Sequence, residues 1–122
     1  MYEIGVRRRF SAAHRLRNYN GKCENLHGHN YTVELTVRGE GLVDGMLMDF
    51  AQLKQKLDSV LKILDHGYIN DIAPFTEIEP SAENIAQYLS TSLSVQISGT
   101  VTISSVKVWE SDDNWAIYRP EK

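Results

Sequence analysis

Two segments of the chain alternate between apolar and polar side chains with a period of two residues. The alternation is loose over residues 2–13 and cleaner over residues 30–38, and it is typical of a β-strand with one buried face. The apolar positions are Tyr2, Ile4, Val6 and Phe10 in the first segment, and Tyr31, Val33, Leu35 and Val37 in the second. We expect these segments to form neighbouring antiparallel strands.

Two helices are predicted in the middle of the chain, where the apolar period lengthens. Asp49 is a plausible N-cap of the first helix, with Gln52 at the capping-box position. Its apolar stripe consists of Phe50, Leu53, Leu57, Val60, Leu61 and Leu64. A second helix is expected after Pro80, with Ser81 as its cap. The buried residues of this helix are expected to be Ile85, Ala86, Leu89 and Leu93.

A final pair of strands is predicted over residues 101–110 and 115–119, joined by the turn-forming residues 111–114. The resulting order is β-β-α-α-β-β. Strands grouped at both ends of the chain around two helices predict an α+β fold, in which a four-stranded antiparallel sheet carries both helices on one face. With 122 residues, residues 1–122 are expected to form one domain.

Composition and charge narrow the range of functions. A net charge of −3 gives no general reason to expect nucleic acid or an anionic membrane as a partner. The single cysteine excludes an internal disulfide. The N-terminus lacks the pattern of a secretion signal, and no apolar run approaches the length of a membrane span. We therefore expect a soluble cytoplasmic protein.

The richest chemistry lies in the segment around His27 and His29, which also contains Cys23 and Glu24. Histidine is the commonest protein ligand of zinc, and three histidines with an open fourth position are typical of a catalytic zinc site. Residues two apart in an extended segment point the same way, so His27 and His29 can share one ion. His14 would join them from the preceding strand. The simpler alternative is a histidine pair with local hydrogen bonds beside an inert thiol at Cys23.

Two further positions are candidates for catalysis. Asp65 and His66 place a carboxylate beside an imidazole just after the first helix, an arrangement that can tune a histidine for proton transfer. These two residues can instead simply end the helix. Glu110 follows apolar neighbours on one face of a strand, where a carboxylate needs a partner or a ligand. It can instead face solvent at the strand end.

Taken together, these residues resemble the 6-pyruvoyltetrahydropterin synthase and 6-carboxytetrahydropterin synthase family over nearly the whole chain. Six separate matches occur in the family's order, which is far more specific than any one of them. The matching stretches are residues 10–14 (FSAAH), Cys23 with His27-Gly28-His29, residues 48–50 (MDF), residues 64–66 (LDH), residues 81–84 (SAEN) and residues 108–110 (VWE). The three-residue gap between Cys23 and His27 is similar to that of the carboxy-forming enzymes of queuosine biosynthesis.

This resemblance implies a tunnelling fold, whose sheets join into a barrel within a trimer or hexamer, with active sites between subunits. It implies that Zn²⁺ is bound by His14, His27 and His29, and that Cys23 is the proton-abstracting thiolate. Asp65 and His66 match the pair that completes the proton relay, and Glu110 matches the pterin anchor, which we count with the catalytic group. Ser81 and Glu83 match residues that line the substrate pocket. The implied substrate is the small molecule 7,8-dihydroneopterin triphosphate, with no nucleic acid or membrane partner.

Three alternatives stay open, and the first is the 6-pyruvoyltetrahydropterin synthase activity of the same family. Glu24 also allows the segment to be interpreted as Glu-x-x-His-Gly-His, the arrangement of a sister group that cleaves the side chain of dihydroneopterin for folate. Glu24 is then an alternative base. A non-catalytic zinc-binding assembly protein is the competing hypothesis from another class. Basic residues that could hold the triphosphate, or form a solvated face, are Arg7, Arg8, Arg9, Arg15, Arg17 and Lys22.

Overall fold

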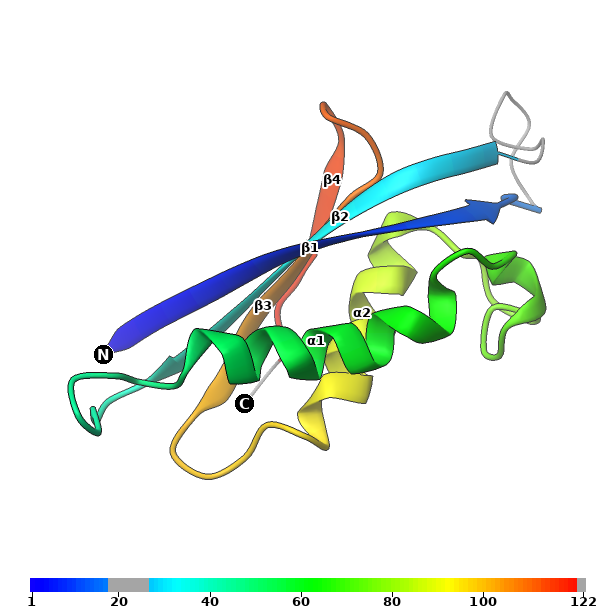
Figure 1. Cartoon of the computed structure of the whole chain (residues 1–122). Coiled ribbons are helices and arrows are strands. Elements are labelled where there is room, and N and C mark those ends of the chain that lie inside the picture. Colours follow the sequence, from blue (N-terminus) through cyan, green and yellow to red (C-terminus); the bar gives the residue numbers. More distant parts are fainter. Residues whose placement is uncertain (18–26, 121–122) are drawn as a thin grey trace.

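The computed structural model describes residues 1–17 and 27–120 of the chain. Four strands form one antiparallel sheet in the order β1-β2-β3-β4. Their bounds are β1 (Tyr2–His14), β2 (His27–Gly39), β3 (Thr102–Trp109) and β4 (Trp115–Tyr118). Two helices, α1 (Phe50–Leu64) and α2 (Ala82–Ser94), cover one face of the sheet, and a short 3₁₀ helix, η2 (Ile69–Asp71), lies between them in sequence (Figure 1). The predicted order and α+β fold class are confirmed.

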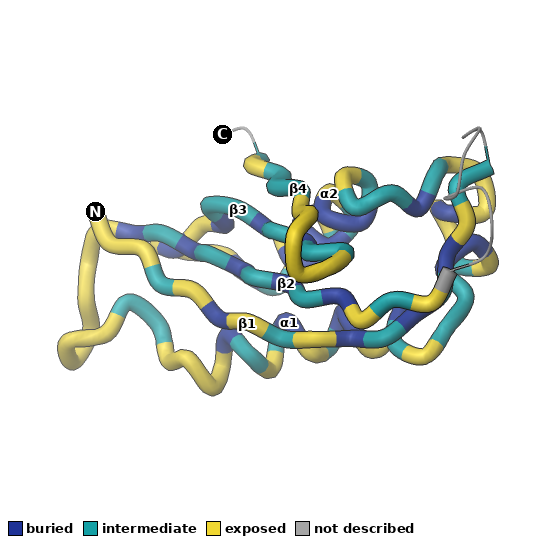
Figure 2. Tube along the Cα trace, turned by 90° about the horizontal axis from the view of Figure 1, so that it is seen from above, coloured by how far each residue is buried: buried dark blue, intermediate teal, exposed yellow. Residues whose placement is uncertain are grey.

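Strands β1 and β2 form a long antiparallel pair that extends to the histidines. Their register runs from Tyr2 opposite Gly39 to His14 opposite His27. Val6, Phe10, Ala12 and His14 are buried on β1, and Tyr31, Val33, Leu35 and Val37 on β2, so the predicted alternation is confirmed (Figure 2). Pairing continues beyond the predicted bounds, which brings the histidine segment into the sheet. Tyr2 is half exposed, because it lies at the free end of its strand.

Helix α1 begins at its predicted cap. The Asp49 side chain accepts a hydrogen bond from the Ala51 amide at 2.9 Å. The stripe residues Leu53, Leu57, Val60, Leu61 and Leu64 are buried as predicted. Phe50 is the exception, since 53% of it is exposed. The angular position of Phe50 around the helix axis fits the apolar stripe. Phe50 is exposed because it is the first residue of the helix, and the stripe is buried only from the second turn onward. Gln52 is also exposed, and the cap bond is the one made by Asp49.

Helix α2 also begins at its predicted cap, where the Ser81 hydroxyl accepts from the Asn84 amide at 3.2 Å. Its buried residues include the four predicted ones together with Ser90. Among the described residues, no helix combines the length and the apolar character that crossing a membrane requires.

The segment after α1 returns to the outer edge of β1. The Asp65 carboxylate accepts from the Ser11 amide at 2.9 Å, the His66 amide donates to the Ser11 carbonyl, and the Ala13 amide donates to the Gly67 carbonyl at 3.0 Å. This contact is not visible in the apolar pattern, because polar atoms make it. It places Asp65 and His66 beside the end of β1 that carries His14.

Candidate metal centre and active site

Two histidines and a glutamate converge at the end of the sheet. One possible ligand atom from each of His14, His29 and Glu110 lies within 4.8 Å of the others. His29 is paired with Ala12 in the register, so it shares a face with His14 on the neighbouring strand. The two imidazole rings meet edge to face, with centroids 5.0 Å apart. Glu110 follows β3 on the face of the buried Val106 and Val108, and its carboxylate meets this pair of histidines.

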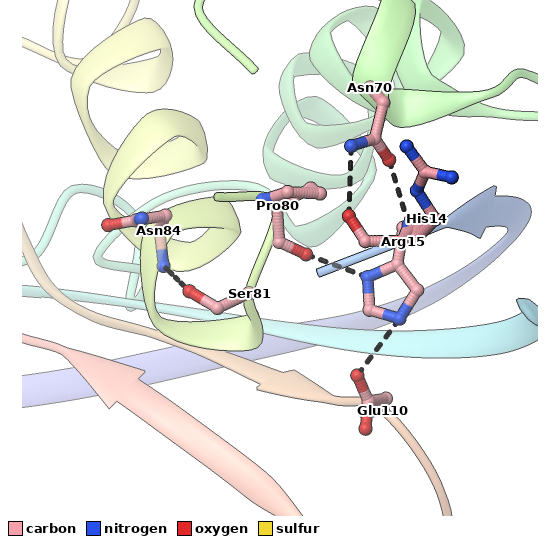
Figure 3. Close-up of polar contacts among 7 residues, drawn as sticks. All are labelled: His14, Arg15, Asn70, Pro80, Ser81, Asn84 and Glu110. Atoms are coloured by element: carbon pink, nitrogen blue, oxygen red, sulfur yellow. Dashed lines mark hydrogen bonds and ion pairs between the residues drawn. The ribbon is translucent and has the colours of Figure 1, made fainter. Parts of the chain in front are cut away.

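The orientation of His14 is fixed from both sides of its ring. Nδ1 lies 2.7 Å from the Pro80 carbonyl oxygen, and Nε2 lies 3.3 Å from Oε2 of Glu110 (Figure 3). A carbonyl can only accept, so Nδ1 donates to Pro80 and Nε2 is directed at Glu110. Burial alone would lower the pKa of His14, but the hydrogen bonds to Glu110 and Pro80 and the charge of Glu110 raise it.

The chain after His14 is held by the segment between the helices. The buried Asn70 side chain accepts from the Arg15 amide at 2.8 Å and donates to the Arg15 carbonyl at 2.9 Å. The Arg17 guanidinium donates to the carbonyls of Phe75 and Ile78 at 2.6 and 3.1 Å. These bonds keep the end of β1 in place, so His14 does not depend on the strand ladder alone for its position.

Several of the predicted basic residues have structural partners. Arg7 pairs with Glu34 at 2.8 Å and Arg8 with Asp58 at 3.1 Å, while Arg17 binds carbonyls as described above. Arg9 lies elsewhere: it lines a cavity of about 520 Å³ together with Asp65 and His66. Arg9 thus borders the candidate catalytic pair.

The donor set at this end of the sheet fits a zinc ion. Zinc binds imidazole nitrogen and carboxylate oxygen, and these are the groups that converge here. The bond from Nδ1 of His14 to a carbonyl also matches the usual outer contact of a zinc-binding histidine, which leaves Nε2 for the ion. His27 begins β2 opposite His14, but its side chain lies outside the described part of the structure. Its role as third ligand stays a prediction.

Asp65 and His66 form a hydrogen-bonded pair. Oδ2 of Asp65 lies 3.0 Å from Nδ1 of His66. The Ser11 amide lowers the pKa of the Asp65 carboxyl; partial burial opposes this effect, and the contact with His66 adds to it. His66 has a φ of +59°, a backbone conformation that costs a residue other than glycine about 1 kcal/mol or more. Asp65 is also the C-cap residue of α1, so the pair does end the helix, and its catalytic role stays a prediction.

A cavity links this pair to the histidine cluster. Its volume is about 380 Å³, and His29, Gly28 and Ala13 line it together with His66 and Gly67. The side chain of His66 is 83% exposed, so it is accessible from solvent. The geometry therefore combines a candidate cation site, the hydrogen-bonded Asp65–His66 pair, and a cavity that borders His29 and His66.

The remaining predicted residues divide into two groups. Ser81 caps α2 directly after Pro80, and Glu83 is exposed on the first turn of that helix, outside the cluster of His14, His29 and Glu110. Cys23 and Glu24 fall within residues 18–26, outside the described residues.

Sequence reasoning missed the supporting residues around His14. Asn70 and the Pro80 carbonyl act through contacts that span more than fifty positions of the chain, and no local pattern marks them. Tyr31 was predicted as a strand residue alone, although it follows His29 by two positions and contacts both histidine rings. Tyr31 and His29 are two residues apart on one strand and so point to the same face, and this spacing could have placed Tyr31 at the site.

Comparison with known proteins adds independent information. The sequence model of a family described as 6-pyruvoyl tetrahydropterin synthase matches residues 3–121. The 6-carboxy-5,6,7,8-tetrahydropterin synthase of Synechocystis is 36% identical over 115 residues, which cover 89% of this chain and 86% of the relative. The dihydroneopterin monophosphate aldolase of Pyrococcus furiosus is 36% identical over 110 residues, or 90% of each chain. The solved 6-pyruvoyl tetrahydropterin synthase of Caenorhabditis elegans matches with a TM-score of 0.85 at 31% identity, and the match covers 99% of this chain and 98% of that one.

Proposed function

Because the chain belongs to the 6-pyruvoyl tetrahydropterin synthase family, we propose that it is a zinc-dependent 6-carboxy-5,6,7,8-tetrahydropterin synthase of the route to queuosine. The family makes it a lyase-type pterin synthase with the tunnelling fold of the solved relative. The proposed reaction converts 7,8-dihydroneopterin triphosphate into 6-carboxytetrahydropterin, acetaldehyde and triphosphate. The observation that carries the proposal is the convergence of His14, His29 and Glu110 beside the Asp65–His66 pair.

The proposed zinc site consists of His14, His29 and His27. Pro80 and Asn70 support it by fixing the ring of His14 and the chain that follows it. When bound, zinc supplies Lewis acidity to the side-chain hydroxyls of the substrate and acidifies the attached protons. A ligand set of three histidines leaves the coordination position that such a substrate needs.

Proton transfer is assigned to Cys23 and to the Asp65–His66 pair. Cys23 stands four residues before His27 in sequence, and a thiolate near a cationic site has a lowered pKa and acts as a base. Asp65 is held ionised by the Ser11 amide and orients His66 through Nδ1. The other ring nitrogen of His66 is then available to a proton in the cavity.

Glu110 is assigned to the pterin ring. A carboxylate can accept two hydrogen bonds from the amino-pyrimidinone edge of a pterin, and Glu110 lies next to the candidate cation site. We assign Ser81 and Glu83 to the lining of the same pocket. β1 is an edge strand, and the segment after α1 covers only its residues 11–13. The rest of this edge can pair with another subunit. Self-association to a trimer or hexamer would therefore bring further subunits to this pocket.

Side-chain cleavage to 6-hydroxymethyl-7,8-dihydropterin is the second candidate function. It is favoured by Glu24, a carboxylate that is ionised at neutral pH without help from a metal, and by the similarity to the aldolase of Pyrococcus furiosus. Formation of 6-pyruvoyltetrahydropterin is the third, since the solved relative from Caenorhabditis elegans carries that name.

Product analysis decides among these functions. The purified, zinc-loaded protein is incubated with 7,8-dihydroneopterin triphosphate, and pterins and acetaldehyde are quantified. Carboxytetrahydropterin with an equal amount of acetaldehyde supports the proposal. Hydroxymethyldihydropterin or pyruvoyltetrahydropterin supports one of the other two activities, and no conversion leaves the non-catalytic zinc-binding role.

Two adjacent variants then separate the candidate bases. Cys23→Ala is expected to keep zinc and lose the carboxy product, while Glu24→Gln is expected to keep that product. If Cys23→Ala retains full turnover and Glu24→Gln does not, the base is Glu24 and the assignment of Cys23 is wrong.

A further inference from the structure

The hydroxyl of Tyr31 is a buried polar group without a hydrogen-bond partner among the residues that the structure describes. Tyr31 is fully buried, and the ordinary pKa of a tyrosine phenol is about 10. The hydroxyl therefore keeps its proton at neutral pH and is a hydrogen-bond donor. A buried donor without an acceptor is destabilising, and folded proteins contain few of them. An acceptor that reaches the hydroxyl in another state of the protein would account for it.

The ring of Tyr31 is held in place by three neighbouring rings. Phe10 stacks on it with centroids 4.8 Å apart and the planes at 10°. The rings of His14 and His29 approach it at centroid distances of 5.9 and 5.6 Å. Protein interiors are close-packed, so the ring cannot swing its hydroxyl into water without displacing these neighbours. The acceptor must therefore come to the hydroxyl.

Glu110 is placed to be that acceptor. Thr32 pairs with Trp109, the last residue of β3. Extending this register by one residue beyond the end of β3 sets Tyr31 opposite Glu110. Opposite positions of antiparallel strands point to the same face of the sheet.

In this structure Glu110 contacts His14. Its Oε2 lies 3.3 Å from Nε2 of His14, whose Nδ1 donates to Pro80. This contact needs a hydrogen on Nε2. A ring nitrogen whose lone pair binds a cation has no hydrogen to donate, so a cation held at Nε2 ends the hydrogen bond between His14 and Glu110.

We propose that metal binding at His14 transfers the Glu110 carboxylate from the His14 imidazole to the hydroxyl of Tyr31. The inference rests on the proposed function, because it takes a metal ion at His14 as its premise. Tyr31 is then a positioning residue that acts through Glu110. The Tyr31 hydroxyl donates the hydrogen bond that replaces the lost contact between Glu110 and His14. It thereby fixes the Glu110 carboxylate for the pterin only in the metal-loaded protein.

Tyr31→Phe tests this inference, because it removes the hydroxyl and keeps the ring. The denaturation midpoint of the metal-free variant is expected to equal or exceed that of the wild type, since an unpaired buried donor is gone. The affinity for Zn²⁺ alone, measured by competition with a chelator, is expected to fall about tenfold to a hundredfold, as for other supporting residues of metal sites. Tyr88→Phe is the matched control. It removes the same group from a tyrosine that packs on Phe75, and zinc affinity is expected to stay unchanged.

A double-mutant cycle tests whether Tyr31 acts through Glu110. In a Glu110→Ala background, Tyr31→Phe is expected to cause no further change in zinc affinity, because the acceptor is already absent. Wild-type zinc affinity in Tyr31→Phe, or an undiminished effect in the Glu110→Ala background, overturns the inference and leaves the proposed function intact. A parallel loss of metal-free stability also overturns it, since the hydroxyl would then be a contact of the fold. Failure of the wild-type protein to bind Zn²⁺ overturns the proposed function itself, and the inference with it.

Discussion

Replacing Asn70 by aspartate probes the support of the metal centre from a position that contacts neither substrate nor metal in the proposed site. Asn70 is 6% exposed, and it exchanges two hydrogen bonds with the backbone of Arg15, at 2.8 and 2.9 Å. Asn70→Asp keeps the acceptor for the Arg15 amide. It also replaces the donor by a carboxylate oxygen that faces the Arg15 carbonyl.

The expected loss of stability follows from these contacts. One lost hydrogen bond is worth roughly 1 kcal/mol, and a buried carbonyl left without its donor costs about 1–3 kcal/mol. A carboxylate in a buried position adds a desolvation cost. We therefore expect Asn70→Asp to lower the free energy of unfolding by about 3 kcal/mol or more, a large share of the roughly 5–15 kcal/mol of an ordinary domain. Zinc affinity should also fall, because the chain directly after His14 loses an anchor.

Urea denaturation of the metal-free protein measures the first effect, and chelator competition with Zn²⁺ measures the second. Asn30→Asp is the control, because it makes the same chemical change at an exposed asparagine whose Oδ1 accepts from the Ser11 hydroxyl at 2.6 Å. We expect it to cost less than about 0.5 kcal/mol, the usual range for surface changes. As the pH falls, the difference between Asn70→Asp and the wild type should shrink, since a protonated carboxyl can again donate to Arg15. A loss below about 1 kcal/mol, the cost of one ordinary hydrogen bond, or a difference that does not respond to acid, would refute the reasoning.

Four further predictions concern single features of the fold and the site. Ser81→Ala should lower stability by about 1 kcal/mol through loss of the α2 cap, and Ser81→Asp should restore it; a change in the KM for the pterin that persists in Ser81→Asp would separate a pocket role from the cap. The Ser11 amide lowers the pKa of Asp65, so the ionised carboxylate stabilises the fold above its unfolded pKa near 3.8. This stabilisation is lost as the pH falls through the lower folded pKa. In acid titration, the free energy of unfolding of Asp65→Asn should lack this pH-dependent loss. Glu110→Gln should keep zinc and lose pterin affinity in calorimetry, whereas loss of zinc would identify Glu110 as a ligand. Removal of zinc by a chelator should lower the melting temperature, and a hundredfold excess of free zinc over its Kd should restore about 2.7 kcal/mol.

The fold follows from local patterns to a large extent, because each element is amphipathic with its own period. Alternation located β1 and β2, and caps at Asp49 and Ser81 located the starts of both helices. The prediction for Phe50 failed because periodicity gives the angle of a side chain around a helix and not the extent of the surface that covers it. That extent depends on the neighbouring elements and is settled only by packing.

The site was predictable only in part, for a physical reason. His14 and His29 could be brought together because one strand pair carries both, and register is a local property. The bond from His14 to Pro80 and the return of Asp65 to the edge of β1 are polar contacts between distant segments. Such contacts leave no apolar period in the sequence. The interpretation of Cys23 and Glu24 depends on family resemblance, and both lie outside the described residues.

The place of the site in the fold follows from a mismatch in length between strands and helices. β1 and β2 have 13 residues each, and α1 has 15. At about 3.3 Å per strand residue and 1.5 Å per helix residue, the strands extend roughly 43 Å and the helix roughly 22 Å. The helices therefore cannot cover the whole face of the strand pair. Where they cover it, the alternating inward positions are apolar, as at Val6 and Leu35.

Beyond the reach of the helices, the same inward positions of the two strands carry His14 and His29, and the segment between the helices closes over them through Asn70 and Pro80. The alternation that places apolar side chains in the core therefore also places the imidazoles of His14 and His29 side by side on the same face. A single-residue shift in the register of β1 against β2 would turn His14 to the opposite face of the sheet and remove the core residues of β1 with it. Stability of the strand pair and assembly of the proposed metal centre are therefore coupled, and a variant that slips this register should lose both together.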